Sequence, residues 1–344
     1  MKILIIGGTG NISTPITKSL LERGHDLTLF NFDPQPPEWL RPAKVITGDR
    51  THRAEFEQKL GGLGPFDCVI DMICYEPADA ECDVRTFQGR TQQFIFCSTV
   101  DVYTKTPRAY PVTEENGELG ALPSFPYGHK KMACESLLWE AHRRGDFALT
   151  VCRPTFTYNE SWSPGIHSFG GQSYHLDRLR KGKPILMHGD GTSVWVASYR
   201  DDTARAFVGA AGNPKAYGQA YNVSGDEWMT HNHIWRTIAR VLGAPPPDFV
   251  YIPTELLGKL APQQAEWCVE NFRHNNLFDN TKAKRDLGFR YTVRFEDGVR
   301  KCLDYLQAHN LIEDCAKYPF YDRLVEAWRH SEASLIERFR ANPA

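Results

Sequence analysis

The chain has 344 residues, of which 41% are hydrophobic and 24% charged. This composition excludes general disorder and predicts one large domain or two joined domains. Lysine and arginine (40) nearly balance aspartate and glutamate (42), and the sequence pI is near 6.6. No global field therefore draws the chain to nucleic acid or to an anionic membrane, and a small ligand bound at a local site is favoured.

Nine cysteines are scattered along the chain without a CxxC pair. This pattern is typical of reduced thiols in a cytosolic enzyme and not of a disulfide or zinc framework, so we expect a cytoplasmic protein with no metal site. The opening apolar run is short and ends in glycines, so we expect no signal peptide. No run approaches the roughly 20 apolar residues of a membrane span.

Short apolar runs alternate with helical patterns through the first half of the chain. The predicted strands are 2–6, 27–30, 45–47, 68–73, 93–98 and 148–153, and the predicted helices are 15–23, 56–60, 78–87 and 127–143. Strands separated by helices in this way predict a parallel, doubly wound α/β sheet. The run at 93–98 lacks alternation, as a strand buried on both faces does.

The amino-acid composition changes after Tyr158, where the stretch SWSPGIHSFGG is rich in glycine, serine and proline. This change predicts a loop or a domain boundary. We place a first domain at 1–157, joined by a strand within 189–225, and a mainly substrate-binding lobe with C-terminal helices at 158–344. In the second part we predict strands at 185–187 and 220–223 and helices at 231–242, 295–308 and 321–339.

A glycine-rich turn, ILIIGGTGNIS, ends the first strand and opens a helix. Gly7 and Gly10 stand where backbone amides approach a pyrophosphate at a helix N-terminus, and a Cβ there would block the approach. Ser13 replaces the third glycine of the usual pattern. We expect a dinucleotide to contact Gly7, Thr9, Gly10, Asn11 and Ile12.

With this turn, a series of ordered motifs resembles the extended short-chain dehydrogenase/reductases, specifically the NAD-dependent epimerase/dehydratase family. The motifs are IGGTGNIS, GDR at 48–50, FIFCSTVDVY, YGHKK, CRPTFTY, HGDGTSVWVASYRDDTARAF, YNVSGDE and TKAKRDLGF. They span roughly residues 1–310. The resemblance implies a seven-stranded parallel Rossmann sheet that binds NAD and a smaller C-terminal lobe that closes over the substrate, and we expect a homodimer.

Tyr127 and Lys131 form a chemically sensible proton-transferring pair. A phenol with a pKa of about 10 is a poor base at neutral pH. A lysine at i+4 on a helix faces the same side, and its cation favours the phenolate, whereas Lys130 points elsewhere. Their spacing alone would favour a tyrosine and a lysine on a helix surface without a catalytic role. Their place among the ordered motifs favours the catalytic pair instead.

Three polar residues follow the predicted strand at 93–98. The resemblance implies that the Thr99 hydroxyl binds the substrate oxygen, and Ser98, on the opposite strand face, is the competing substrate contact. Asp101 shares the Thr99 face, or is simply a polar strand end. In the sugar 4,6-dehydratases the threonine is followed by Asp-Glu. Here those positions are Val100 and Asp101, so elimination lacks its acid and Asp101 remains to bind a hydroxyl or to deprotonate carbon beside a transient ketone.

The segment after the second strand indicates which cofactor is bound. Asn31 and Asp33 lie where a carboxylate typically holds the adenosine ribose hydroxyls of NAD. Phe32 stands where close relatives often carry an arginine, so NAD is favoured over NADP. Arg50 and Arg53 keep NADP open. By the same resemblance the other cofactor contacts are Asp49 near the adenine, Arg50, Cys74 and Tyr75 after the fourth strand, and Pro154 near the nicotinamide.

The substrate motifs depart from the nucleotide-sugar pattern in one direction. Phe156 replaces a family asparagine, and Trp195 replaces an arginine that usually grips a diphosphate. Losing a guanidinium removes the best partner for phosphate, and the aromatics supply stacking faces for a base or sugar ring. We therefore expect Ser98, Phe156, Tyr158 and Trp195 to contact a nucleoside-like or less charged sugar. Core packing of both rings is the alternative, with Arg178, Arg180 or Arg200 gripping a diphosphate.

These residues predict an enzyme that oxidises a sugar-ring hydroxyl with bound NAD through Thr99, Asp101, Tyr127 and Lys131, and that returns the hydride to give epimerisation. A net sugar dehydrogenase or reductase is an alternative. So is a non-catalytic relative that binds RNA or senses a dinucleotide. Retention of Thr99, Tyr127 and Lys131 together favours chemistry, and the lack of a basic, aromatic-interleaved tract disfavours RNA.

Overall fold

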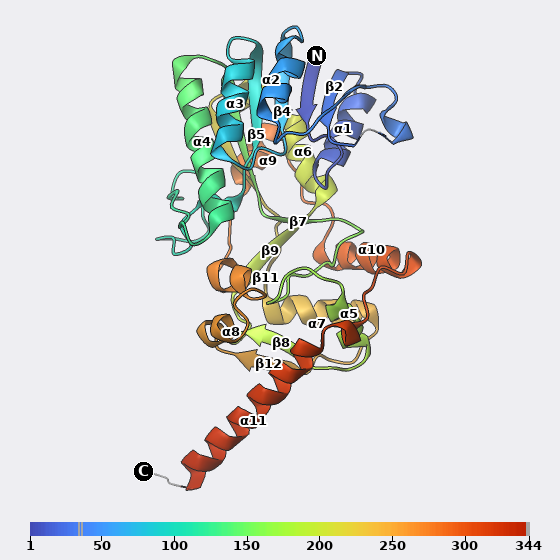
Figure 1. Ribbon diagram of the computed structural model, residues 1–344, viewed down its shortest axis with the longest axis vertical. Helices are drawn as coiled ribbons and strands as arrows, with labels where there is room; N and C mark the ends of the chain where they lie inside the picture. Colours follow the sequence, from blue (N-terminus) through green and yellow to red (C-terminus); the bar gives the residue numbers. More distant parts are fainter. Residues whose placement is uncertain (34, 36, 342–344) are drawn as a thin grey trace. The chain divides into compact units, whose positions relative to one another are not determined.

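The computed structural model describes residues 1–33, 35 and 37–341 (Figure 1). Within it the chain divides into two compact units. The first unit comprises 1–158, 196–227 and 276–293, and the second comprises 159–195, 228–275 and the described residues from 294 onward. No helix among the described residues combines the length and the apolar character that crossing a membrane requires.

The first unit is built on a seven-stranded sheet in the order β10-β6-β5-β4-β1-β2-β3. Its pairs are parallel, with Lys2 opposite Asp26 and Ile3 opposite Cys68. The strands are β1 (Lys2–Ile6), β2 (Asp26–Asn31), β3 (Lys44–Thr47), β4 (Phe66–Asp71), β5 (Thr91–Cys97), β6 (Ala148–Pro154) and β10 (Gln219–Val223). The expected seven-stranded parallel sheet is thus confirmed. The strand order reverses between β1 and β4, and in such sheets ligands bind at the carboxyl ends beside that point.

Helices cover both faces of this sheet, and the residues of β1 alternate between two cores. Ile3 and Ile5 pack in the core that contains α1 (Ser13–Glu22), α6 (Arg200–Ala210) and α9 (Thr281–Leu287). Leu4 and Ile6 pack in the core that contains α2 (Arg53–Gly61), α3 (Pro77–Phe87) and α4 (Pro126–Arg144) (Figure 1). The remaining short elements of this part are η1 (Glu38–Leu40), η2 (Val100–Val102), β7 (Phe156–Tyr158) and η3 (Pro214–Ala216). β9 (Val194–Tyr199) belongs to the first unit from Val196 onward.

The helices that position the site have clear local signals. α3 begins with Pro77 and a capping box in which the Glu76 and Asp79 side chains bond each other's backbone amides. α4 likewise begins with a proline, Pro126, and ends at Gly145, whose φ of 85° is left-handed. These signals fix where α4 starts and therefore place Tyr127 in its first turn.

The second unit is mainly helical. Its elements are α5 (Tyr174–Arg180), β8 (Ile185–His188), β11 (Trp228–Thr230), α7 (His231–Leu242), β12 (Phe249–Ile252), α8 (Thr254–Leu260), the π-helical η4 (Cys268–Phe272), α10 (Phe295–Ala308), η5 (Cys315–Lys317) and α11 (Pro319–Ala341). β12 and β8 pair in parallel. Thr230 caps α7 by accepting a bond from the His233 amide.

The first turns of α11 belong to the core of this unit. The Tyr321 side chain is fully buried, its hydroxyl accepts a 2.6 Å bond from the Leu186 amide, and it bonds His167 Nε2 at 2.9 Å. Further along the helix, Leu335 and Phe339 are 56% and 69% exposed. The helix is therefore anchored at its N-terminal end.

Candidate active site

The glycine-rich turn after β1 fits a phosphate group. Gly7 has a φ of 78°, and the Gly8 amide donates a 2.9 Å bond to the side-chain oxygen of Asn31. α1 begins at Ser13, its N-cap residue Ile12 makes no side-chain cap, and no acidic residue lies in its first turn. The first amides of a helix lack intrahelical partners and favour anions. The turn therefore suits the pyrophosphate of a dinucleotide, with Asn31 holding the turn.

Other residues of the turn are tied to their surroundings. The Gly10 amide donates a 2.7 Å bond to Ser13 Oγ. Asn11 Nδ2 donates a 2.8 Å bond to the Thr157 carbonyl of β7, and Thr9 is exposed. The turn and β7 are therefore held together.

The residues expected at the adenosine end lie after β2 and β3. Phe32 is 75% exposed, and the exposed Asp33 carboxylate accepts a 2.8 Å bond from the Gln35 amide. Asp49 accepts bonds from the Thr51 hydroxyl and amide, which lower the pKa of Asp49. Asp33 and Asp49 are thus accessible acceptors that could hold ribose hydroxyls and adenine.

Arg50, expected at the cofactor, lies inside the first unit. Its side chain is 6% exposed, with Nη2 2.7 Å from Asp83 and 3.3 Å from Asp71 carboxylate oxygens, and it donates to the Asp79 carbonyl. Arg53 is held by Asp79 as well, at 2.9 Å. Both guanidinium groups are therefore engaged within the protein, and a 2′-phosphate would have to compete with these carboxylates for them.

Lys131 is enclosed between β4 and β5. Its side chain is buried, and Nζ donates to the carbonyl oxygens of Cys74 (2.9 Å) and Cys97 (2.5 Å). The rings of Phe96 and Tyr75 cover the ammonium at 4.4 and 5.1 Å from their centroids. Because an ammonium has three N–H donors, one is left for a hydroxyl of the site or of a cofactor.

Two expected cofactor contacts are buried. The Cys74 thiol hydrogen-bonds to Cys134, and this bond together with burial raises the pKa of Cys74. The Cys74 carbonyl, by contrast, is the group that meets Lys131. Pro154 ends β6 and is buried.

Tyr127 is half-buried and lies one helical turn before Lys131 on α4. Burial raises the pKa of its phenol above the usual value, and the Asp101 carboxylate, the Cys97 thiol and the Tyr75 phenol raise this pKa further. A hydrogen bond with the Thr99 side chain acts in the opposite direction. The Tyr127 phenol is therefore in surroundings that, taken together, disfavour the phenolate.

Asp101 is bound on both carboxylate oxygens. Thr99 Oγ1 lies 3.3 Å from Oδ2, and Lys105 Nζ lies 2.6 Å from Oδ1. The side chains of Asp101 and Lys105 are 13% and 15% exposed. The sequence analysis did not predict Lys105 as a site residue. The chain is not a continuous helix between Asp101 and Lys105, so their spacing alone does not bring the two side chains together.

Ser98 belongs to a buried network below the site. Its hydroxyl donates a 2.5 Å bond to Glu135 Oε1, and Arg153 binds both oxygens of Glu135 at 2.9 and 2.6 Å. Arg153 also donates to the Tyr103 hydroxyl at 2.7 Å. Ser98 is therefore committed to Glu135, which disfavours its expected role as a substrate contact.

The predicted substrate aromatics lie in separate units. In the first unit, Phe156 is half-buried and stacks on the buried Tyr158 at 6.1 Å. In the second unit, Trp195 is 6% exposed and packs edge-on against Phe272 (5.3 Å) and beside His231 (5.9 Å). Among the described residues the Trp195 indole Nε1 has no hydrogen-bond partner. Ring packing accounts for much of the placement of Phe156 and of Trp195. The buried Trp195 N–H still lacks an acceptor, which a ligand or a water molecule would supply.

The cation Arg178, an alternative diphosphate ligand, is fully buried. It donates 2.7 Å to Asp322 and bonds the Pro184 carbonyl, with its guanidinium over the Tyr321 ring at 3.8 Å. This side chain is part of the core of the second unit and does not present its charge to a substrate.

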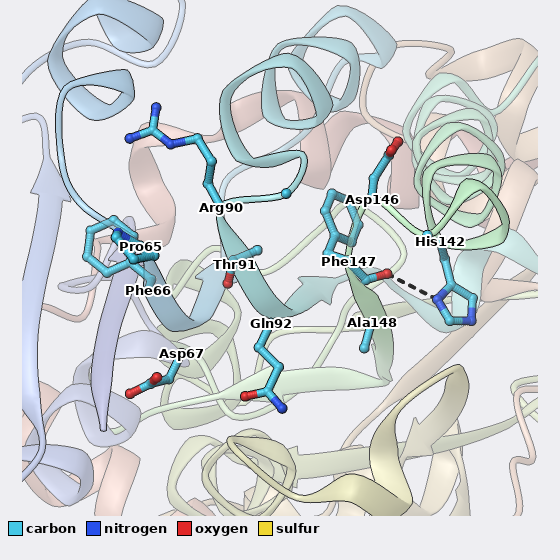
Figure 2. A pocket seen from close by; sticks show the side chains of 12 residues that line it. Pro65, Phe66, Asp67, Arg90, Thr91, Gln92, His142, Asp146, Phe147 and Ala148 are labelled. Carbon is cyan, nitrogen blue, oxygen red and sulfur yellow. Dashed lines mark hydrogen bonds between the residues drawn. The ribbon is translucent and has the colours of Figure 1, made fainter.

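A hollow of about 650 Å³ lies in the first unit, at the N-terminal ends of β4, β5 and β6. Figure 2 shows the side chains that line it. Arg90 in its wall donates to the carbonyls of Gly61 and Leu63, and His142 Nδ1 bonds the Phe147 carbonyl at 3.1 Å. These groups are already engaged. The hollow also lies at the edge opposite the carboxyl ends, where ligands of parallel sheets bind, so we do not assign the active site to it.

The sequence is similar to those of one protein family and of several characterised proteins. The NAD dependent epimerase/dehydratase family matches residues 3–224. A chloroplast stem-loop binding protein of 41 kDa from Arabidopsis thaliana is 28% identical over 315 residues, covering 87% of this chain and 77% of that protein. The 2′-dehydrokanamycin reductase of Streptomyces kanamyceticus is 23% identical over 285 residues, covering 81% and 77%.

Among solved structures, UDP-glucose 4-epimerase from Thermotoga maritima, solved with UDP-glucose, has a similar fold. The TM-score is 0.68 at 22% sequence identity, and the match covers 90% of this chain and 100% of the epimerase chain. This likeness concerns the fold.

Proposed function

Because the chain belongs to the NAD-dependent epimerase/dehydratase family of short-chain dehydrogenase/reductase enzymes, with NAD as cofactor, we propose that it oxidises a secondary hydroxyl of a sugar ring to a transient ketone. NAD, when bound, would supply the hydride acceptor, and return of the hydride to the opposite face of the ketone would give the epimer. Gly7, Gly10 and the start of α1 would hold the pyrophosphate, and Asp33 the adenosine ribose.

The observation that carries this proposal is the arrangement of Thr99, Tyr127 and Lys131. The Thr99 side chain acts to lower the pKa of the Tyr127 phenol, and Lys131 is fixed by the Cys74 and Cys97 carbonyls with one donor to spare. Tyr127, as phenolate, would accept the hydroxyl proton and give it back on return. Thr99 would orient the substrate oxygen, and Lys131 would favour the phenolate.

For the substrate we propose a nucleoside-like or nucleotide sugar held with few ionic contacts. Trp195 stands where the diphosphate-gripping arginine of the resembling family is expected, and Arg178 is committed to Asp322. The name of the relative 2′-dehydrokanamycin reductase supports only the part of this proposal that dispenses with a diphosphate grip, since the substrate it states carries no nucleotide.

A kinetic screen tests the proposal. Nucleosides, UDP-, dTDP- and GDP-sugars and free aminoglycoside sugars are offered with NAD, and NADH absorbance and product NMR are followed at low and high salt. We expect turnover that changes little with salt, because few ion pairs are screened. Trp195→Ala should lower kcat/KM by roughly ten-fold or more, as loss of a stacked ring does. Efficient turnover of a nucleotide diphosphate sugar with strong salt inhibition would contradict the substrate assignment.

Two alternatives have specific support. A net reductase is favoured by the name of the kanamycin relative. In the screen, which offers NAD, its reverse reaction would accumulate NADH in proportion to the ketone formed. RNA binding is favoured by the name of the chloroplast relative. Gel-shift titration with a stem-loop RNA tests it, and tight binding without turnover would replace our proposal. The cytoplasmic homodimer that we also propose is tested by fractionation and light scattering.

A further inference from the structure

Lys105 is the cation nearest to Asp101 in the described site, and its role is not explained by the proposed hydride chemistry. Its Nζ lies 2.6 Å from Asp101 Oδ1 and 5.5 Å from the centroid of the Phe125 ring. Phe125 in turn packs edge-on against Tyr127, with ring centroids 6.3 Å apart. Lys105 therefore reaches the surroundings of Tyr127 through both Asp101 and Phe125.

The ion pair is shielded from water. Its side chains are only 13% and 15% exposed, so their charges interact more strongly than those of a surface pair. The other carboxylate oxygen of Asp101 accepts a bond from Thr99, whose side chain acts to lower the pKa of Tyr127. One carboxylate thus links a lysine to the proposed proton-transferring group.

We propose that Lys105 is a positioning residue of this site, which holds the Asp101 carboxylate and neutralises its charge beside Tyr127. This proposal rests on the proposed function. The Asp101 carboxylate accepts a 3.3 Å bond from Thr99 Oγ1, but its charge opposes ionisation of Tyr127. Lys105 keeps the Asp101 carboxylate in place for the bond from Thr99. Its positive charge also offsets most of the negative charge that Asp101 presents to Tyr127.

The other groups that face Tyr127 make this compensation necessary. They are the Cys97 thiol at the end of β5, the Tyr75 phenol after β4, the Thr99 hydroxyl, the Asp101 carboxylate from η2, and Lys131 on α4 itself. Burial, Asp101, Cys97 and Tyr75 act against the phenolate, whereas the Thr99 side chain and the Lys131 cation favour it. Lys131 is a single cation already bound to two carbonyls, so a second cation that offsets Asp101 lowers the cost of ionising Tyr127.

The test needs no substrate. A fluorinated tyrosine, whose phenol is more acidic than that of tyrosine, is incorporated only at position 127 of the full chain, and its ¹⁹F resonance is titrated with pH in the presence of saturating NAD. Lys105→Met should raise the titration midpoint by roughly one pH unit, the size of effect a charge within about 4–6 Å has. Lys105→Arg, which retains the cation, should restore it. Asp101→Asn should lower the midpoint.

The double variant distinguishes positioning from mere proximity. If Lys105 acts through Asp101, then in the Asp101→Asn background Lys105→Met should move the midpoint by less than half as much. Lys130→Met is the matched control, since it removes a lysine that pairs with Glu76 at 2.7 Å and is 45% exposed, and it should not move the midpoint. An unchanged midpoint in Lys105→Met, or an equal shift in both backgrounds, would overturn the proposal. Failure of the kinetic screen with the expected titration would instead refute the proposed reaction.

Discussion

Glu135 and Arg153 form a bidentate ion pair in the interior of the first unit. Arg153 Nη2 lies 2.6 Å from Glu135 Oε2, and Arg153 Nε lies 2.9 Å from Glu135 Oε1. Glu135 lies one turn beyond Lys131 on α4, and Arg153 lies on β6. The pair therefore fixes α4, and with it Tyr127 and Lys131, against the carboxyl ends of the strands.

We expect Glu135→Ala to lower the free energy of unfolding by about 3–5 kcal/mol, because it leaves a buried guanidinium without its counter-charge. Urea unfolding followed by circular dichroism measures the change. Glu57→Ala is the control, since its pair with Arg85 is 33–55% exposed and should cost less than about 1 kcal/mol. Equal effects of the two substitutions would show that the buried pair does not support α4.

Tyr127→Phe should reduce turnover of the substrate found in the screen by roughly 10²–10⁴-fold, because it removes the proton acceptor. NAD affinity should change little, since the phosphate turn is untouched. Lys131→Met should reduce turnover and also weaken NAD binding, because the remaining donor of its ammonium is lost. Lys130→Met is the control for both. Steady-state kinetics and calorimetric titration provide the two readouts, and Tyr127→Phe activity within a few-fold of the parent would refute the assignment.

NAD should bind more tightly than NADP, and calorimetry with both cofactors measures the difference. Phe32 is exposed where an arginine would meet a 2′-phosphate, and Arg50 is bound to Asp83 inside the protein. Phe32→Arg should lower the ratio of the NADP dissociation constant to the NAD dissociation constant by about ten-fold or more. One charge-assisted contact of roughly 1.4 kcal/mol has this effect.

Arg53→Ala is the matched control for the cofactor prediction, because Arg53 is held by Asp79. It should leave the ratio of the two affinities unchanged. Tighter binding of NADP to the parent protein, abolished in Arg53→Ala, would show that this arginine leaves Asp79 for the phosphate.

Acid should destabilise the second unit through four buried histidines. Burial lowers the pKa of His188 to about 4 and lowers those of His167, His175 and His231 as well. An unfolded histidine binds a proton below about pH 6.5, whereas these remain neutral to lower pH. The unfolded state therefore takes up more protons, and stability falls as the pH drops from about 6.5 towards 4, by up to roughly 1.4 kcal/mol per pH unit for each histidine.

His175→Phe tests this pH dependence, because both ring nitrogens of His175 are without partners among the described residues and its ring stacks on His167 at 3.7 Å. The melting temperature of the variant should fall less between pH 7 and pH 5 than that of the parent protein. His330→Gln, at an exposed position of α11, should leave the slope unchanged. A parallel fall in His175→Phe and parent would remove His175 from the acid response.

Much of the fold could be predicted where local signals coincide. The predicted helices at 231–242 and 295–308 match α7 and α10, since each combines an amphipathic pattern with clear ends, such as the Thr230 cap and Gly243. β12 (Phe249–Ile252), which pairs with β8, was not predicted. α1 begins two residues earlier than predicted, within the phosphate turn.

The candidate site was predictable in its motif residues but not in the partners that hold them. Thr99, Tyr127 and Lys131 stand in ordered motifs, and the structure brings them together. The position of Arg50 depends on Asp83, which is remote in sequence and meets it only after α3 packs on the sheet. The position of Ser98 likewise depends on a residue remote in sequence, because its hydroxyl donates a hydrogen bond to Glu135 of α4. Such contacts arise from tertiary packing, and no local pattern reports them.

The central claim is that Tyr127 moves a proton while NAD is transiently reduced. The most direct measurement mixes the NAD-bound enzyme rapidly with the substrate from the screen and follows NADH absorbance through one turnover. The account predicts a rise that decays as the hydride returns, with Tyr127→Phe showing no rise although it binds NAD. Product formation without any NADH signal in the parent, or an undiminished signal in Tyr127→Phe, would contradict it.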